Sequence, residues 1–270
     1  VGEWILRANP TTGKSEVVIH APVSKHCIPN GMLDPQRLIY YGGTAPGTGD
    51  ANEGIQFFAY DIEGKKVLYS GPNGPARAMM LASSTGKVYF TPGSSATPLM
   101  RFDPTSGKPP EEIPGEIGLR AATDETAAGK IFTVSAGGKE SGSTIYAFDV
   151  KSENIETLGP AAVGVNQYVA SIKADPRGRY LYYVPGAHGG ADADGSPIVQ
   201  FDTKTKTRKV IAFVASYFQQ EFGCIPKGTY GVALDEKAER LFITWNVLRG
   251  TKNWDTCGLM VVHIPPEERE

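Results

Sequence analysis

Hydrophobic and polar residues alternate in short runs along the whole chain, and turn-forming residues separate the runs. A period-2 pattern recurs in four stretches that each begin with a basic residue: Arg37–Tyr41, Lys87–Phe90, Arg179–Tyr183 and Arg240–Thr244. A period of two residues puts successive side chains on opposite faces of a β-strand. We therefore predict strands here, and we expect their aromatic residues to pack between neighbouring sheets.

A second pattern occurs four times: an apolar run that ends in an aromatic residue and Asp, followed by a polar turn. The copies are Gln56–Asp61, Leu99–Asp103, Ile145–Asp149 and Ile198–Asp202. A spacing of roughly 40–50 residues, with about four short strands in each unit, is typical of a β-propeller. We interpret the aspartates as turn caps, because Asp side chains accept hydrogen bonds from nearby backbone amides.

The repeats predict an all-β fold, one β-propeller domain over residues 1–270 built of four-stranded antiparallel blades. The predicted units are a half-blade at 1–22, blades at about 30–73, 77–115, 118–160 and 166–215, and a three-strand blade at 228–265. The two partial blades together hold five strands, one more than a single blade needs. We therefore expect the C-terminal part of a seven-bladed ring, completed by missing blades or by another polypeptide. The alternative is a five-bladed ring with one strand displaced.

The aromatic-Asp phrases resemble the repeats of the large propeller superfamily with streptogramin-lyase-like, gluconolactonase-like and quinoprotein-like members. The resemblance covers almost the whole chain but identifies no single family. The tryptophan-docking motifs of quinoproteins are not recognisable, and neither is the Gly-His and Trp-Asp pairing of WD40 repeats, since Trp254-Asp255 is a solitary dipeptide. It implies a functional face at the mouth of a central channel, because the loops there vary while the blades hold them rigidly.

Composition and charge give no support for nucleic-acid or membrane partners, and they favour a fold rich in turns. The formal charge of −2 gives no reason to expect a nucleic acid or an anionic membrane. No apolar stretch approaches the ~20 residues of a membrane span. The 32 Gly and 20 Pro are scattered between apolar runs, which favours many tight turns and little helix.

The cysteines indicate the redox state of the cellular compartment in which we expect the protein. Cys224 and Cys257 both fall in the last repeat, and a disulfide between them would indicate an oxidising compartment. The alternative is two unrelated buried thiols; Cys27 is left over in either case. The chain begins at Val1 rather than Met, so we expect a mature, processed or truncated product. With a candidate disulfide and no N-x-S/T glycosylation sequon, we expect a bacterial exported protein in the periplasm or outside the cell.

Aligning the repeats places one residue of each unit just before its innermost strand. We expect these four residues to converge on the channel mouth: Arg77, Arg120, Tyr168 and Tyr230. Arg forms paired hydrogen bonds with carboxylate or sulfate, and Tyr donates a further one, so an anionic small molecule or an acidic saccharide is the predicted ligand. The alternative is that the arginines pair with neighbouring carboxylates or backbone carbonyls.

Histidines and aspartates predicted on the same face are candidates for a general base or for metal ligands. His188 follows a strand end, where it could act as a general base or a metal ligand. Asp192 and Asp194 are candidate calcium ligands, although the later Glu of a calcium loop is absent and a solvated acidic loop is the alternative. His20 and His26 together with His188 would form a three-His site for a divalent transition metal.

The sequence leaves three functions open, and it does not settle whether the protein is an enzyme. No G-x-S-x-G or P-loop motif is present. The first function is an exported propeller that binds a partner protein or an anionic ligand at its channel mouth. The second is a lyase acting on uronate polysaccharides, in which Arg77 or Arg120 neutralises the carboxylate and Tyr168, Tyr230 or His188 removes the proton. The third is a metal-dependent lactonase or hydrolase.

Overall fold

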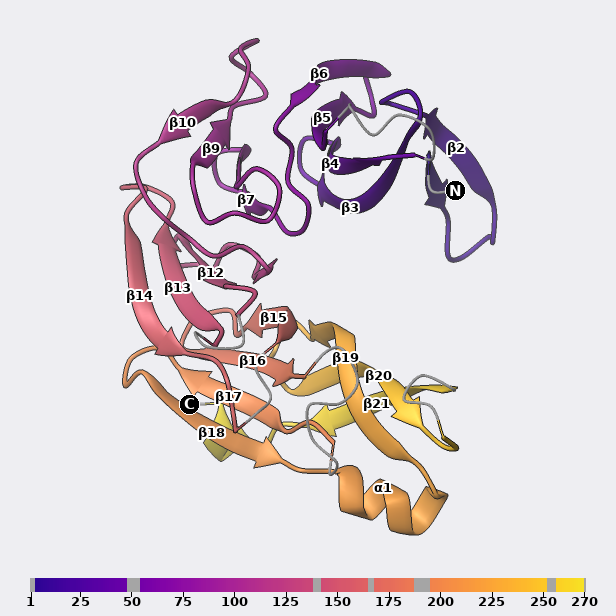
Figure 1. Cartoon of the computed structure of the whole chain (residues 1–270), viewed down its shortest axis with the longest axis vertical. Coiled ribbons are helices and arrows are strands. Elements are labelled where there is room, and N and C mark those ends of the chain that lie inside the picture. Colours follow the sequence, from indigo (N-terminus) through magenta and orange to yellow (C-terminus); the bar gives the residue numbers. More distant parts are fainter. Residues whose placement is uncertain are drawn as a thin grey trace. The chain divides into compact units, whose positions relative to one another are not determined.

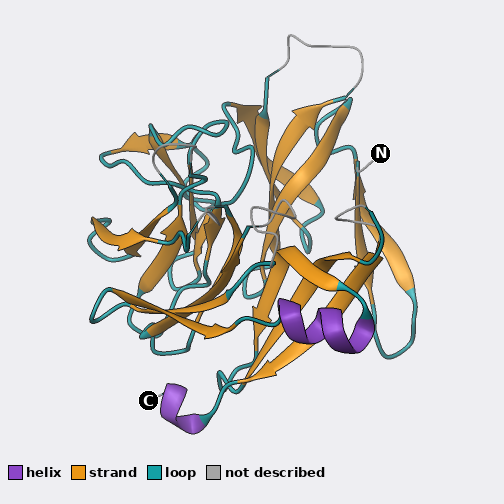
Figure 2. Cartoon of the chain, turned by 60° about the horizontal axis from the view of Figure 1, so that its bottom comes forward, coloured by secondary structure: helices purple, strands orange, loops and turns teal. Residues whose placement is uncertain are grey.

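Short antiparallel strands make up most of the protein (Figures 1 and 2). The computed structural model describes residues 3–47, 54–137, 142–164, 168–186, 195–251 and 256–269. Within these ranges the strands form six sheets, and in each sheet the strands follow one another in chain order. None of the helices in these ranges has the length and apolar character that crossing a membrane requires.

Four of the sheets have four strands each. Those nearer the N-terminus are β3–β6 (His26–Asp34, Ile39–Pro46, Gln56–Asp61, Lys66–Pro72) and β7–β10 (Met80–Ala82, Lys87–Phe90, Leu99–Phe102, Glu111–Ile113). The next two are β11–β14 (Ala121–Ala122, Lys130–Val134, Thr144–Asp149, Ile155–Pro160) and β15–β18 (Val169–Ala174, Tyr180–Pro185, Ile198–Asp202, Thr207–Ala212).

The remaining strands lie toward the ends of the chain. β1 (Trp4–Ala8) and β2 (Ser15–His20) pair as a hairpin, and the last sheet holds β19 (Ile225–Leu234), β20 (Arg240–Leu248) and β21 (Thr256–His263). The helix α1 (Ala215–Phe222) precedes β19, and a short 3₁₀ turn, Pro266–Glu268, follows β21.

Five of the six sheets are the blades of a five-bladed β-propeller, so the predicted all-β propeller is confirmed. The expectation that the chain is the C-terminal part of a seven-bladed ring is wrong. It arose because the sequence pattern counted the β1–β2 hairpin as half of an additional blade, whereas the structure has four four-stranded blades and β19–β21 as the fifth. The proposed second polypeptide that would supply the missing blades loses its basis.

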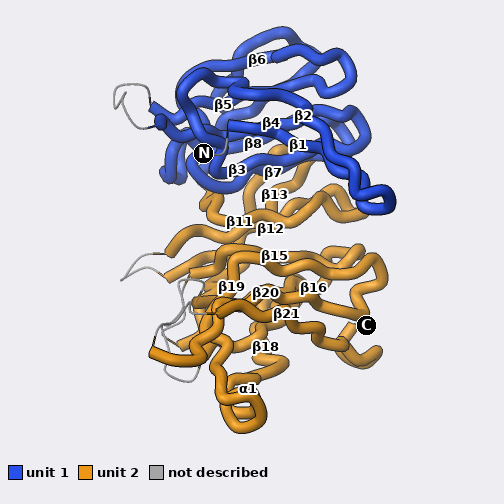
Figure 3. The backbone as a smooth tube through the Cα atoms, turned by 90° about the vertical axis from the view of Figure 1, so that its right-hand side faces the viewer, with its two compact units in different colours: residues 1–116 blue, residues 117–270 orange. Residues whose placement is uncertain are grey.

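Contacts divide the chain into two compact units, residues 1–116 and 117–270 (Figure 3). The core of the first unit is aromatic, with the Phe57 ring centroid 4.5 Å from that of Phe90 and 5.2 Å from that of Phe102. In the second unit, Tyr182 and Tyr183 of β16 are fully buried in two different apolar clusters, one on each face of the blade β15–β18. The prediction that the aromatic residues pack between sheets is confirmed.

The aspartates of the repeated phrase cap the turns that follow them, as predicted. In each copy the Oδ1 atom accepts a hydrogen bond from a backbone N–H two or three residues further on. The pairs are Asp61 with Gly64 (2.7 Å), Asp103 with Thr105 (2.9 Å), Asp149 with Ser152 (2.8 Å) and Asp202 with Lys204 (2.8 Å). These caps explain why the phrase recurs: each one closes the connection between the third and fourth strands of a blade.

Candidate functional site

The first strands of three successive blades are neighbours in the second unit. β11 contacts β15, and β15 contacts β19. Arg120 directly precedes β11, Tyr168 directly precedes β15, and Tyr230 lies within β19. Residues at equivalent positions of adjacent blades are therefore close in space although they are separated by about 50 residues in sequence.

Arg120 and Tyr168 are in direct contact. The Nε atom of Arg120 donates a hydrogen bond to the phenol oxygen of Tyr168, and the guanidinium carbon lies 4.5 Å from the centroid of the ring. Both backbones are fixed. The Arg120 N–H donates to the Val134 carbonyl (2.7 Å), and the Tyr168 carbonyl accepts from the Gly186 N–H (2.9 Å). The pair is thus held by two adjacent blades and not by a long loop.

The charge of Arg120 is the chemically important feature of this pair. Its side chain is half-buried, and among the residues that the structure describes it forms no ion pair with a carboxylate. A guanidinium stays protonated in proteins, and a neutral phenol does not cancel its charge. The terminal nitrogens, which donate to no described residue, are therefore suited to a carboxylate or sulfate of a ligand. The alternative in which Arg120 pairs with a neighbouring carboxylate is not observed in this part of the chain.

The other two aligned residues are placed differently. Arg77 belongs to the first unit and is exposed, and it makes no hydrogen bond or ion pair within the described ranges. Tyr230 is 46% exposed and lies where the pairing of β19 with β20 is irregular, between Gly228 and Gly231. The structure brings together Arg120 and Tyr168 and places Tyr230 on the next inner strand. Convergence of all four residues stays a prediction.

Two of the described histidines, His20 and His26, contact neighbouring side chains. The His20 ring stacks on Trp4 with centroids 3.8 Å apart. His26 is only 2% exposed, and its Nδ1 atom lies 2.8 Å from the Thr44 hydroxyl. No cluster of three His, Cys, Asp or Glu side chains that could hold a metal occurs in the described ranges. The remaining members of the predicted metal and base sites, His188, Asp192 and Asp194, lie outside the described residues, so those sites stay predictions.

The predicted disulfide is not formed: Cys27, Cys224 and Cys257 are free thiols. Cys257 pairs with Asn246 of β20, whereas Cys224 directly precedes β19 on the other side of β20. Strands lie about 4.8 Å apart, so two residues separated by an intervening strand are at least about 9 Å apart. Disulfides need Cα atoms within about 7 Å. The thiols therefore give no support to export, which stays a prediction.

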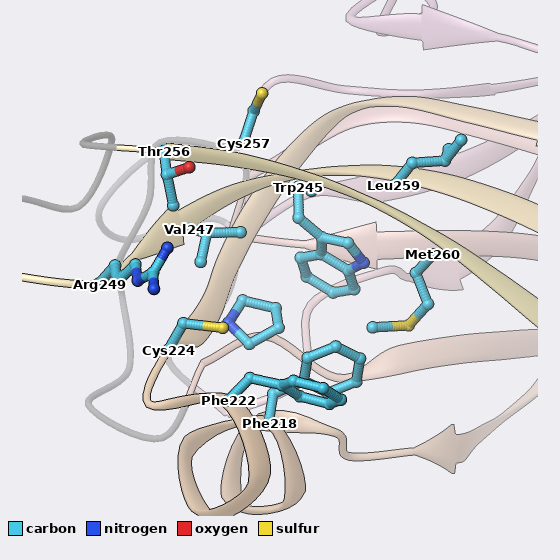
Figure 4. A pocket seen from close by; sticks show the side chains of 12 residues that line it. Phe218, Phe222, Cys224, Trp245, Val247, Arg249, Thr256, Cys257, Leu259 and Met260 are labelled. Carbon is cyan, nitrogen blue, oxygen red and sulfur yellow. The ribbon is translucent and has the colours of Figure 1, made fainter.

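Sequence reasoning missed one pocket in the second unit. It has a volume of about 290 Å³ and lies between α1 and the strands β20 and β21 (Figure 4). Trp245, Phe218, Phe222 and Met260 are among its apolar lining residues. Trp245 directly follows the alternating stretch Arg240–Thr244, but this pattern does not say which segment covers its side chain.

Comparisons with known proteins identify the fold. No family model and no curated protein sequence matches the chain. TolB from Acinetobacter baumannii matches with a TM-score of 0.57 and 10% identity, over 98% of this chain and 58% of TolB. An oligogalacturonate lyase in complex with manganese matches with a TM-score of 0.66 and 11% identity, over 100% of this chain and 73% of the lyase.

The β-propeller domain of the Trilobed protease from Pyrococcus furiosus matches with a TM-score of 0.55 and 14% identity, over 98% of this chain and 75% of that domain. All three are propellers, as the repeats implied, and no single family is identified. Identities this low show the fold alone. The chain spans less than two thirds of the length of TolB.

Proposed function

We propose that the protein is a binding propeller that takes an anionic small molecule or an acidic saccharide at Arg120 and Tyr168. The observation that supports this is a half-buried guanidinium held against a phenol, with no carboxylate partner among the described residues. Hydrogen bonds between charged groups are about twice as strong as neutral ones, and Arg adds the planar geometry that carboxylate and sulfate match. The Tyr168 hydroxyl accepts from Arg120 and lies beside the guanidinium, so it is a second polar group next to the same ligand position.

Isothermal titration with trigalacturonate, compared with the neutral sugar trigalactose, tests the proposal. We expect R120Q to bind trigalacturonate at least about 10-fold more weakly, since it loses a charge-assisted pair, and Y168F about 3-fold more weakly. R177Q is the matched control, because Arg177 is exposed and lies in the turn that follows β15, at the opposite end of this strand from Tyr168. Unchanged binding by R120Q, or equal affinity of the wild-type protein for the neutral sugar, would contradict the proposal.

A second candidate, a lyase acting on uronate-containing glycans, is favoured by the contact between Arg120 and Tyr168. Elimination from a uronate needs a cation that neutralises the carboxylate and a base that removes the adjacent proton. Arg120 could supply the first and Tyr168 the second, and one structural neighbour is an oligogalacturonate lyase. No described feature favours the metal-dependent lactonase, which stays a prediction.

One measurement distinguishes the lyase from the binding propeller. A lyase releases an unsaturated uronate, which absorbs in the ultraviolet, when it is incubated with polygalacturonate with or without added Mn²⁺. For a lyase we expect Y168F to lose turnover at least about 100-fold while it still binds trigalacturonate. Binding without any product from the wild-type protein would rule out this candidate and leave the binding propeller.

A further inference from the structure

The pocket between α1 and the last blade is lined mainly by apolar side chains. Phe218 and Phe222 come from α1, Trp245 and Val247 from β20, and Met260 from β21 (Figure 4). Its volume of about 290 Å³ is large enough for a small organic molecule. The pocket lies wholly within the second unit and shares no residue with the Arg120–Tyr168 pair.

Trp245 contributes a buried hydrogen-bond donor to this pocket. Its side chain is only 2% exposed, and its Nε1 atom is buried without a hydrogen-bond acceptor among the described residues. Buried indole N–H groups are ordinarily paired, because leaving a donor unpaired away from water costs free energy. A ligand that brings an acceptor into the pocket would remove this cost.

The neighbourhood of the Nε1 atom indicates what kind of acceptor fits. In Figure 4 the nitrogen-bearing edge of Trp245 faces the side of the pocket that holds Met260. Methionine is unbranched and adapts by rotation, so its side chain can move aside for an incoming atom. A charged oxygen would lose its hydration among these apolar walls, whereas a neutral carbonyl loses far less. Arg249, the charged residue of the lining, is exposed.

We propose that this pocket binds small, largely apolar molecules that carry a neutral carbonyl oxygen, which accepts the hydrogen bond of Trp245 Nε1. The apolar body packs against Phe218 and Phe222, and the carbonyl lies beside Met260. Recognition depends on both parts: the walls supply burial of apolar surface, and the indole N–H selects for the acceptor.

Acetophenone and ethylbenzene form a matched pair of probes, because they have similar size and only the former carries a carbonyl. In two-dimensional ¹H–¹⁵N spectra, the variant W245F identifies the indole N–H signal of Trp245. We expect acetophenone to shift this signal downfield in a saturable manner and to bind about 5–10-fold more tightly than ethylbenzene. In W245F, binding followed through backbone amide signals should show no preference between the two probes. A wild-type signal that does not shift, or a preference that persists in W245F, would overturn the proposal.

Two variants on α1 keep the test valid if W245F does not fold. Phe222 and Tyr217 are similarly exposed, at 58% and 59%, but only Phe222 lines the pocket. Because both side chains are largely outside the core, neither substitution should unfold the protein. We expect F222A to weaken binding of acetophenone about 5-fold or more and Y217A to leave it unchanged. Equal affinities of the two variants would overturn the proposal.

Discussion

Arg179 holds Asp202 through two parallel hydrogen bonds, Nε to Oδ1 at 2.9 Å and Nη2 to Oδ2 at 2.7 Å. Asp202 also caps the turn after β17 by accepting from the backbone N–H of Lys204. The hydrogen bond from Arg179, followed by those from the backbone, holds the pKa of Asp202 at about 2. One carboxylate therefore joins the turn between β15 and β16 to the end of β17.

We expect D202N to lower the free energy of unfolding by about 1–2 kcal/mol at pH 7, because it removes a charge-assisted pair that is partly screened by solvent. The folded pKa lies below the unfolded value of about 3.9, so this contribution is present above pH ~4 and is lost as the pH falls toward 2. Urea unfolding at pH 7 and pH 3 should show the difference between wild type and D202N shrinking.

D149N is the control for D202N. Asp149 caps the corresponding turn of the preceding blade through Ser152 but makes no ion pair with a described arginine. We expect D149N to cost less stability than D202N at pH 7. Equal losses would mean that Arg179 adds nothing to the turn cap.

The aromatic core of the first unit depends on Phe57. This ring is fully buried and lies against the rings of Phe90, Phe102 and Tyr69. We expect F57A to lower the free energy of unfolding by about 3–5 kcal/mol, because it leaves a cavity among these rings, and F57L by about 1–1.5 kcal/mol.

Urea unfolding followed by circular dichroism measures both variants of Phe57. F213A is the control, because Phe213 is 46% exposed and its removal should change stability by less than about 0.5 kcal/mol. A loss in F57A no larger than that in F213A would contradict a close-packed aromatic core.

The strands of this fold could be predicted from sequence because their signals are local. The aromatic-Asp phrases became β5, β9, β13 and β17, the third strands of four blades. The number of blades could not be predicted in the same way. It depends on how the β1–β2 hairpin and the three strands β19–β21 are counted, and pairing between distant segments leaves no local pattern.

The contact between Arg120 and Tyr168 followed from aligning the repeats, because the inner strands of adjacent blades are neighbours. The disulfide failed for a related reason: nearness in one repeat did not reveal that β20 lies between Cys224 and Cys257. The pocket at Trp245 could not be predicted, since its wall combines two strands with the helix α1, and the composition had favoured little helix.

Asn30 of β3 forms hydrogen bonds with Pro75, which precedes the next blade, and with Gly43 of β4. Only glycine fits at position 43. The Nδ2 atom of Asn30 donates to the Pro75 carbonyl at 3.0 Å, and its Oδ1 atom accepts from the Gly43 N–H at 3.0 Å. A Cβ atom on Gly43 would lie 2.1 Å from the Pro75 carbonyl oxygen. We expect G43A to cost about 2–4 kcal/mol in urea unfolding, because the backbone must move. G54A should change stability by less than about 0.5 kcal/mol, because no atom of the described residues lies within 4 Å of its Cβ position. Similar effects of the two would contradict this packing.

Tyr183 should make stability depend on alkaline pH. Its hydroxyl is buried and donates to the Ala161 carbonyl at 2.9 Å, and burial raises the pKa of this phenol well above its ordinary value of about 10. The contribution of Tyr183 to the free energy of unfolding is therefore fully present below pH ~10. It decreases as the pH rises further, because only the unfolded chain then releases the proton.

We expect Y183F to cost about 1–2 kcal/mol at pH 7, since the Ala161 carbonyl loses its donor. We also expect Y183F to lose less stability than wild type between pH 10 and pH 11. Urea unfolding across this range measures both effects, and Y217F, which removes an exposed hydroxyl, should leave the free energy at pH 7 unchanged. Parallel declines of wild type and Y183F above pH 10 would show that the buried phenol does not govern alkaline unfolding.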